Sequence, residues 1–440
     1  MKIVEAYRTS VNEHCVPLKE TYPESIKEST IILGKKTGEH FQGFGGAITE
    51  SAAYVLSLMT PEQRRAVLQG YYGKSGLNYH LGRLCISASD FSLSSYDYLS
   101  GEDHSLKSFS LAHEDRYLLP VLKEIEEIRG EPLTLLVSPW SPCAWMKDNQ
   151  EMAHGGRLLP EYYGLWAEYE CRYLEEMAKR GIHPSWISIQ NEPQAVQVWE
   201  SCIYSSEEEA DYALVLRKAL DQHGFQKTGI YIWDHNRDLL VQRANETLSR
   251  PEVNRAVEGI AFHWYVSEDF AQVKKCHEEH PDKHLLFSEG CIETVHVPEV
   301  KMGAFANGER YAKNIIGDLS GGTEGWIDWN IVLDEQGGPN HVGNYCEAPV
   351  QYDRKNHVVL FNHSYFCIEQ FARFILPGAE RIALSFKNPD LQGLAYGNPD
   401  QSVALVLWNS GISQNAVFEV GEKKYSLTLL THSVSTFVLR

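Results

Sequence analysis

The 440-residue sequence lacks long hydrophobic runs and paired cysteine motifs. No stretch approaches the ~18 consecutive apolar residues of a membrane span, and the N-terminal region has no apolar core of a signal peptide. The nine cysteines are scattered and include no CxxC pair, which argues against a disulfide framework or a zinc ribbon. We therefore expect a cytoplasmic protein with reduced thiols and no stable membrane association.

The sequence also has few basic residues. Lys and Arg number 40 against 59 Asp and Glu, which gives a formal net charge of −19. A charge of this sign and size repels a phosphate backbone, so nucleic acid is not an expected partner. The hydrophobic share of 43% is that of a globular protein with an ample core. The oligomeric state stays open.

What the sequence does contain is a regular alternation of apolar runs and amphipathic segments from about residue 42 to 376. Segments such as 61–72 and 161–180 are helix-like and lie between the apolar runs. Such alternation is typical of parallel strands joined by crossover helices. The expected strands are 42–50, 79–89, 133–141, 186–193, 229–236, 259–266, 284–291 and 324–330. Eight such units predict an α/β protein with a (β/α)₈ TIM barrel over residues 41–376.

The pattern changes after residue 377 to short strands separated by turn residues. This C-terminal segment, 377–440, predicts a β-sandwich but is small for an independent domain. We therefore expect the N-terminal segment 1–40, with alternating stretches near 2–7 and 25–33, to add strands to it. The two chain ends would then form one satellite domain fused to the barrel.

Polar and aromatic side chains stand where the expected strands end. The active site of a TIM barrel lies at the C-terminal ends of its strands. Carboxylates and amides that bind hydroxyl groups, together with indoles that stack on a sugar face, suit a neutral polyhydroxylated ring. These strand-end residues include Asp90, Trp140, Asn191, Glu192, Tyr265, Glu289 and Trp329.

Two of the strand-end residues are glutamates that follow apolar runs. Glu192 and Glu289 are 97 positions apart, which places them on strands four and seven, across the barrel mouth from each other. Glycoside hydrolysis uses two carboxyl groups: one protonates the leaving oxygen, and the other attacks the anomeric carbon or activates water. A separation of ~5–5.5 Å between them would make the mechanism retaining.

Structural roles compete with functional ones for several of these residues. Core packing explains Trp140, Trp264 and Trp329 as well as sugar stacking does, and Trp264 is expected to face the helices. His263 is more readily a structural histidine than a metal ligand. No HExxH motif, carboxylate cluster at metal-ligand spacing or intact GxGxxG motif occurs, so we expect no metal ion and no nucleotide cofactor. Small core residues are the better interpretation of Cys85, Cys202 and Cys291.

Eight segments contain distinctive motifs: 42–50, 89–92, 138–142, 190–193, 262–265, 287–290, 328–330 and 337–340. Taken in order, these motifs resemble those of glycoside hydrolase family 30 in its glucosylceramidase-like branch. The resemblance implies a TIM barrel fused to a β-sandwich, retaining cleavage of β-linked sugars, and no metal or organic cofactor.

The same resemblance assigns expected roles. Glu192 corresponds to the general acid/base, Glu289 to the nucleophile and Asn191 to the residue that binds the sugar 2-hydroxyl. Arg83 corresponds to the cation that holds the catalytic carboxylates in place. A general acid is expected to need a raised pKa, here for Glu192. The sugar subsite is expected to be lined by Asp90, Trp140, Tyr265, Trp329 and Asn344.

Together these patterns predict a retaining β-glycosidase that hydrolyses β-glucosides, either glucosylceramidase-like or a β-glucosidase, and that is exo-acting. Its expected partner is a small-molecule or oligosaccharide β-glycoside, and its expected setting is carbohydrate or sphingolipid metabolism. The acidic composition and the lack of a secretion signal favour soluble β-glucosides over an intact membrane glycolipid such as glucosylceramide. A β-xylosidase, a β-fucosidase and an endo-β-1,6-glucanase remain alternatives with the same mechanism. A non-catalytic sugar-binding protein is a remote alternative, because both glutamates are present.

Overall fold

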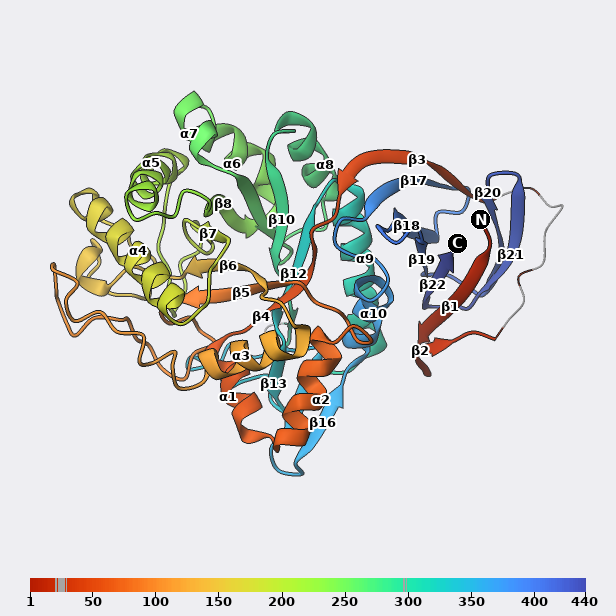
Figure 1. Ribbon diagram of the computed structural model, residues 1–440, viewed down its shortest axis with the longest axis horizontal. Coiled ribbons are helices and arrows are strands. Elements are labelled where there is room, and N and C mark those ends of the chain that lie inside the picture. Colours follow the sequence, from red (N-terminus) through yellow and green to blue (C-terminus); the bar gives the residue numbers. More distant parts are fainter. Residues whose placement is uncertain (20–21, 23–27, 29, 296, 298) are drawn as a thin grey trace.

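The fold is a closed barrel of eight parallel strands beside a separate, mostly antiparallel sheet (Figure 1). A computed structural model describes residues 1–19, 22, 28, 30–295, 297 and 299–440. The barrel strands hydrogen-bond in the order β10-β12-β4-β5-β6-β7-β8-β9. Each of the eight predicted strands contains one of them, so the TIM barrel is confirmed. They are β4 (Gly43–Ala47), β5 (Leu81–Ile86), β6 (Thr134–Pro139), β7 (Trp186–Ser188), β8 (Gly229–Asn236), β9 (Gly259–His263), β10 (His284–Glu289) and β12 (Gly325–Asn330).

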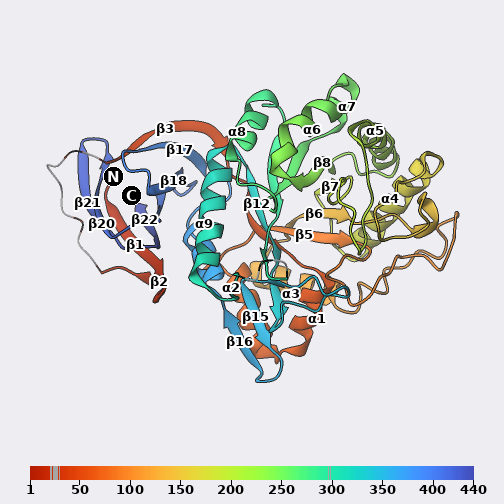
Figure 2. The same cartoon turned by 180° about the vertical axis from the view of Figure 1, so that it is seen from behind.

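Helices cover the outside of the barrel (Figure 2). The helix expected over 61–72 is present with those bounds, because Thr60 caps its N-terminus in a reciprocal capping box with Gln63. The segment expected over 161–180 begins as a 3₁₀ turn, Pro160–Tyr162, and continues as α4. The helices are α1 (Glu50–Leu58), α2 (Pro61–Tyr72), α3 (Leu118–Arg129), α4 (Tyr163–Lys179), α5 (Ser206–Gln222), α6 (Leu240–Thr247), α7 (Pro251–Ala256), α8 (Phe270–Glu279), α9 (Phe305–Ser320) and α10 (His363–Ala372). Among the described residues, no helix combines the length and the apolarity needed to span a bilayer.

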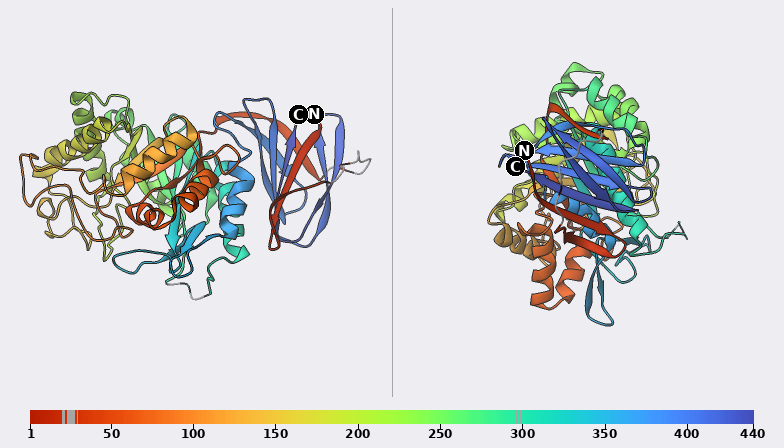
Figure 3. Two further views of the ribbon diagram at one scale, coloured as in Figure 1. Left: turned by 60° about the horizontal axis from the view of Figure 1, so that its bottom comes forward. Right: turned by 90° about the vertical axis from the view of Figure 1, so that its right-hand side faces the viewer.

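Both chain ends contribute to the β-sandwich, where they lie side by side (Figure 3). The N-terminal β1 pairs with the C-terminal β22, and β3 pairs with β17 and β20. Part of the stretch expected near 25–33, residues 25–27 and 29, lies outside the described residues, and β3 begins at Ile31. The strands surround an apolar core that includes Leu405, Phe418 and Phe437. They are β1 (Ile3–Ser10), β2 (Glu13–Pro17), β3 (Ile31–His40), β17 (Glu380–Phe386), β18 (Leu391–Gly397), β19 (Val403–Asn409), β20 (Gln414–Val420), β21 (Lys423–Leu429) and β22 (Ser433–Leu439).

Two small sheets after β10 and β12 were not predicted from the sequence. β11 (Ile292–Glu293) pairs with β14 (Cys346–Glu347), which ties the loop after β10 to the loop after β12. β13 (Val332–Asp334), β15 (Val350–Asp353) and β16 (Val358–Phe361) form the other sheet. These strands are too short to show a clear alternation. Glu293 of β11 and Cys346 of β14 line the cavity at the barrel mouth.

The barrel interior is closed below the mouth by a layer of apolar side chains that includes Leu136, Tyr231 and Leu286. Close packing leaves no room for a side chain at Gly45 on β4. A Cβ atom there would lie 2.3 Å from the carbonyl oxygen of Leu81 on β5, far inside van der Waals contact. The glycine thus lets two neighbouring strands approach and keeps the barrel closed.

Substituting Gly45→Ala is expected to lower the free energy of unfolding by about 1–3 kcal/mol or more, because backbone atoms must move to admit the methyl group. Gly164→Ala is the matched control: this exposed position in α4 has no heavy atom within 4 Å of an added Cβ. The control should gain about 0.5–1 kcal/mol from helix propensity. Urea denaturation of both variants measures the difference, and equal stability of the two would contradict the packing argument.

Candidate active site

Irregularities in the strand pairing shape the mouth of the barrel. The register shifts between Trp233 and His235 on β8, between Phe287 and Glu289 on β10, and between Asp328 and Asn330 on β12. Bulges of this kind change which way the following side chains point. Trp233 and Asp234 also have left-handed φ angles of 71° and 46°. The strand ends therefore depart from simple alternation where the polar residues stand.

A buried ion pair network lies directly beneath the mouth. Arg83 on β5 and Asp234 on β8 have no exposed side-chain surface, and Arg83 Nη2 lies 2.8 Å from Asp234 Oδ2. Burial lowers the pKa of Arg83, but Asp234 and Glu289 outweigh burial and raise it above its ordinary value. Asp234 also accepts hydrogen bonds from the hydroxyl groups of Ser138, Ser188 and Ser288. These contacts connect β5, β6, β7, β8 and β10.

Glu289, at the end of β10, is held through both carboxylate oxygens. Arg83 Nη1 donates a hydrogen bond to Oε2, and the hydroxyl of Tyr265 donates to Oε1 at 2.8 Å. Arg83 Nη2 also donates to Asn191 Oδ1 at 2.8 Å. Since this bond fixes the amide oxygen of Asn191, its NH₂ group is left to donate on the cavity side.

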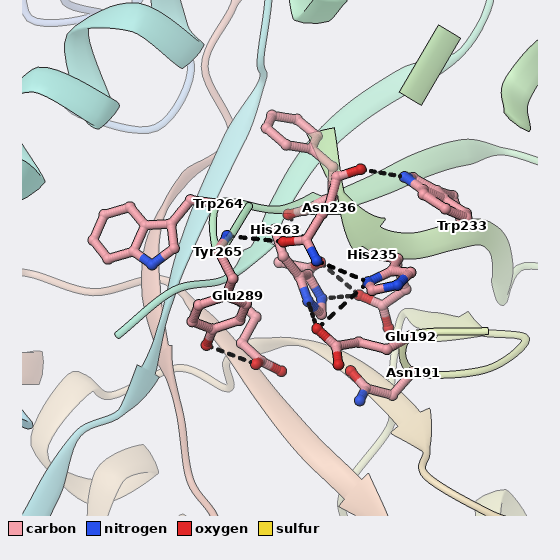
Figure 4. Close-up of polar contacts among 12 residues, drawn as sticks. Asn191, Glu192, Trp233, His235, Asn236, His263, Trp264, Tyr265 and Glu289 are labelled. Atoms are coloured by element: carbon pink, nitrogen blue, oxygen red, sulfur yellow. Dashed lines mark hydrogen bonds and ion pairs between the residues drawn. The ribbon is translucent and has the colours of Figure 1, made fainter. Parts of the chain in front are cut away.

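Glu192 follows β7 in a left-handed conformation with φ of 49°. Its backbone N–H donates to Asp234 O at 3.0 Å, which anchors the turn to β8. Its Oε1 lies 3.1 Å from His263 Nδ1 and 3.5 Å from His235 Nδ1 (Figure 4). The other ring nitrogen of His263 contacts Asp234 Oδ1 at 3.1 Å. Glu192 thus faces two imidazoles, whereas Glu289 faces a guanidinium and a phenol.

The pKa of Glu192 differs from the raised value that an acid role predicts. Burial raises the pKa of Glu192, but the imidazoles of His235 and His263 outweigh burial and hold the pKa well below its ordinary range. Burial lowers the pKa of His263, and the carboxylates around it, Glu289 first, raise it to about 9. The expectation was wrong because the motif around Glu192 carries no sign of the two imidazoles that the neighbouring strands bring to it.

A cavity of about 540 Å³ opens above these residues. Trp140 and Trp329 form one wall, with stacked rings whose centroids are 5.3 Å apart and inclined by 21°. Arg83 lies beneath both rings, 4.9 Å and 5.5 Å from their centroids. All eight residues predicted to touch substrate line this one cavity: Asp90, Trp140, Asn191, Glu192, Tyr265, Glu289, Trp329 and Asn344.

Asp90 occupies a distinct corner of the cavity. Its Oδ2 accepts hydrogen bonds from Asn340 Nδ2 at 3.1 Å and from Asn344 Nδ2 at 3.0 Å. Burial raises the pKa of Asp90 to about 7, with a further contribution from the negative charge of Glu289, although the two amide bonds act to lower it. A carboxyl group of this kind can donate to or accept from a sugar hydroxyl, depending on pH.

Comparison with known proteins agrees with this geometry. The Glycosyl hydrolase family 30 TIM-barrel domain matches residues 41–375, and the Glycosyl hydrolase family 30 beta sandwich domain matches residues 378–437. The chain belongs to glycoside hydrolase family 30. It is therefore a glycoside hydrolase with a β-glycoside as its class of substrate, and the family resemblance seen in the motifs is confirmed.

Three similar proteins place the chain within family 30. Putative glucosylceramidase 4 of Caenorhabditis elegans is 30% identical over 446 residues, covering 96% of this chain and 86% of the relative. The crystal structure of SrfJ from Salmonella typhimurium is 34% identical with a TM-score of 0.94, and the match covers 99% of both chains. The structure of the endo-beta1,6-glucanase BT3312 is 26% identical with a TM-score of 0.89, and again 99% of both chains are covered.

The family 30 site also contains residues that the sequence analysis missed. Asp234 and His235 end β8, and the polar tail of that predicted strand was a usable signal that the analysis did not follow. The hydroxyls of Ser138 and Ser188 give no sequence signal, because serine is common in strands and loops alike. His263 is buried as a structural histidine would be, but it contacts Glu192 directly. Trp264 packs against Tyr311 of α9, outside the barrel, as expected.

The raised pKa of Asp90 predicts a pH-dependent stability. The unfolded chain releases this proton near pH 4, whereas the folded protein keeps it until about pH 7, so Asp90 lowers stability as pH rises through that window. The neutral variant Asp90→Asn removes this effect. The difference in free energy of unfolding, variant minus wild type, should therefore increase from pH 4 to 7 and then level off.

Denaturant titrations at several pH values measure this difference. Asp103→Asn is the control, because hydrogen bonds from Ser105 and Ser108 lower the pKa of Asp103 and keep it ionised throughout the window. Its difference from wild type should stay nearly constant between pH 5 and 7. A flat profile for Asp90→Asn as well would contradict the assigned pKa.

Proposed function

We propose that this family 30 enzyme is a retaining β-glucosidase that works by double displacement. The supporting observation is that Glu192 and Glu289 line one cavity but face different partners. Two carboxyl groups with different environments suit two different roles in one reaction. Glu289 is assigned as nucleophile and Glu192 as general acid/base.

In the first step, a carboxylate oxygen of Glu289 attacks the anomeric carbon while the bond to the leaving oxygen breaks. Arg83 and Tyr265 hold Glu289 in one orientation, which reduces the motion needed to reach the carbon. The NH₂ group of Asn191 is placed to donate to a sugar hydroxyl beside the reacting carbon. Hydrogen bonds of this type strengthen as the ring gains oxocarbenium character.

Glu192 supplies the proton for the leaving oxygen. The imidazole of His263, whose pKa is raised to about 9, holds a proton on Nδ1, 3.1 Å from Oε1 of Glu192, and passes it through that carboxyl group to the leaving oxygen. After the aglycone leaves, Glu192 takes a proton from the water that hydrolyses the glycosyl ester on Glu289. A low pKa does not impede this second step, because the carboxylate form is then the one required.

Short soluble β-glucosides are the proposed substrates, and the stacked Trp140 and Trp329 provide an aromatic wall for the sugar ring. An endo-β-1,6-glucanase is the second candidate, because the 26%-identical solved relative carries that name. A panel of nitrophenyl β-glycosides, glucosylceramide and a β-1,6-linked glucan distinguishes the two. Release of glucose from aryl glucosides supports the first, and internal cleavage of the glucan supports the second.

The substitution Glu289→Gln should lower the rate of hydrolysis of an aryl β-glucoside by several orders of magnitude, because an amide does not form the glycosyl ester. Circular dichroism and thermal unfolding should show an intact fold. Mass spectrometry of the wild-type protein with a 2-deoxy-2-fluoro glucosyl fluoride should show one sugar on the peptide that contains Glu289. A variant that keeps more than a tenth of the wild-type rate, or a label elsewhere, would refute the nucleophile assignment.

Replacing Glu192→Gln should affect substrates according to their leaving groups. Alkyl glucosides, whose leaving oxygen needs a proton, should lose at least about 10²-fold in the glycosylation rate, and dinitrophenyl glucoside should lose much less. Steady-state and burst kinetics on both substrates measure the two rates. Equal losses on the two substrates would remove Glu192 from the acid role.

A further inference from the structure

Three side chains beside the cavity converge on one point. Glu192 Oε1, His235 and His263 each offer one ligand atom, and these atoms all lie within 4.8 Å of one another. The three residues come from β8, β9 and the turn after β7, so the barrel itself brings them together. Figure 4 shows both imidazole rings turned toward the carboxyl group of Glu192. We propose that they form a binding site for a divalent transition metal ion, represented by Zn²⁺, and that its occupancy blocks the acid/base.

The distances from the carboxylate oxygen of Glu192 to the two imidazoles suit a metal of this class. Ligand atoms bound to zinc at about 2.0–2.1 Å in a tetrahedral site lie roughly 3.3 Å from each other. Glu192 Oε1 is 3.1 Å from His263 Nδ1 and 3.5 Å from His235 Nδ1. Two imidazoles and one carboxylate, with a remaining position toward a cavity, also match the donor set that zinc and related ions prefer.

Both imidazoles can present the required lone pair. Tyr265 N–H donates to Asn236 Oδ1 at 2.8 Å, so the NH₂ group of Asn236 faces His235 Nδ1 at 3.2 Å. In the neutral form of His235, the lone pair therefore lies on Nδ1, where it accepts from that amide. A bound metal takes the place of that amide hydrogen, and it also takes the place of the proton shared by Glu192 and His263.

The surroundings of His263 resemble those of metal-bound histidines. Its Nε2 lies 3.1 Å from Oδ1 of the buried Asp234, and a carboxylate behind the ring orients a histidine for metal binding. Asp234 and Glu289 both contact the one guanidinium of Arg83, and Glu192 adds a third carboxylate beside His263. Once a metal ion displaces the proton of His263, these carboxylates outnumber the guanidinium. Glu192 and His235 both line the cavity, which gives an ion a path to the site.

Binding is tested directly on the chelator-treated 440-residue protein. Isothermal titration with Zn²⁺ should show one site per chain, and Co²⁺ should give visible absorption bands of a histidine-containing site at the same stoichiometry. His235→Gln should weaken Zn²⁺ binding by at least about 10-fold, in line with the loss of one ligand. Absence of stoichiometric binding, or unchanged affinity in this variant, would overturn the proposal.

His223→Gln provides the matched control. His223 also contacts two carboxylates, Glu168 and Glu175 at 2.8 Å each, but through opposite ring nitrogens, so its ligand atoms do not converge. This variant should bind Zn²⁺ as the wild type does. If both histidine variants lose affinity equally, the ion binds elsewhere and the proposal fails.

The proposal that the bound metal inhibits the enzyme rests on the proposed role of Glu192 as acid/base. Zn²⁺ should inhibit aryl β-glucoside hydrolysis over the concentration range in which it binds, and a chelator should restore the full rate. Binding without inhibition would overturn the claim that the metal engages Glu192. Absence of any glucosidase activity is a different result. If no glycoside is hydrolysed but Zn²⁺ still binds through His235, the proposed function is refuted and the proposed metal site is supported.

Discussion

The ion pair network of Arg83 with Asp234 and Glu289 is the interaction on which the rest of the site depends. A guanidinium without exposed surface is costly unless its charge and its N–H groups are matched, and here two carboxylates, an amide oxygen and a serine hydroxyl match them. The partners stand on β5, β6, β8, β10 and the turn after β7. The network can form only when the barrel has closed in the correct register, so the geometry of the cavity follows from the closure of the fold.

Strand irregularity determines what the cavity contains. Regular alternation would send successive side chains at a strand end to opposite sides. The bulge at Trp233 and His235, with left-handed φ angles at Trp233 and Asp234, changes this, so that Asp234 reaches Arg83 and His235 reaches Glu192. The left-handed backbone conformation of Glu192 likewise changes the direction of its side chain after β7. Strain of this type is found where function requires a particular side-chain direction.

The sequence therefore predicted what depends on periodicity and left out what depends on these irregularities. Eight apolar runs located the barrel strands, and the turn-rich tail located the β-sandwich, because both patterns repeat over many residues. Glu192 and Glu289 were visible as carboxyl groups at the ends of apolar strands. Asp234 and His235 were passed over because their inward direction depends on a bulge, and β13, β15 and β16 because three or four residues show no reliable period. The lowered pKa of Glu192 depends on contacts between strands that no local motif encodes.

The different environments of the two glutamates explain why one cavity can hold both steps of a glycoside hydrolysis. Arg83 has no proton to give at ordinary pH, so the contact with Glu289 is a fixed one between opposite charges. Glu192 instead faces His263, whose raised pKa keeps a proton within hydrogen-bond distance of the carboxyl group. Once Glu289 is esterified, its negative charge no longer acts on the site. The carboxylate form of Glu192, which the second step requires, then becomes more favourable. Glu192 and its neighbouring imidazoles can bind and release protons. The same groups can act as ligands for a metal ion, because a lone pair that accepts a proton can also bind a metal.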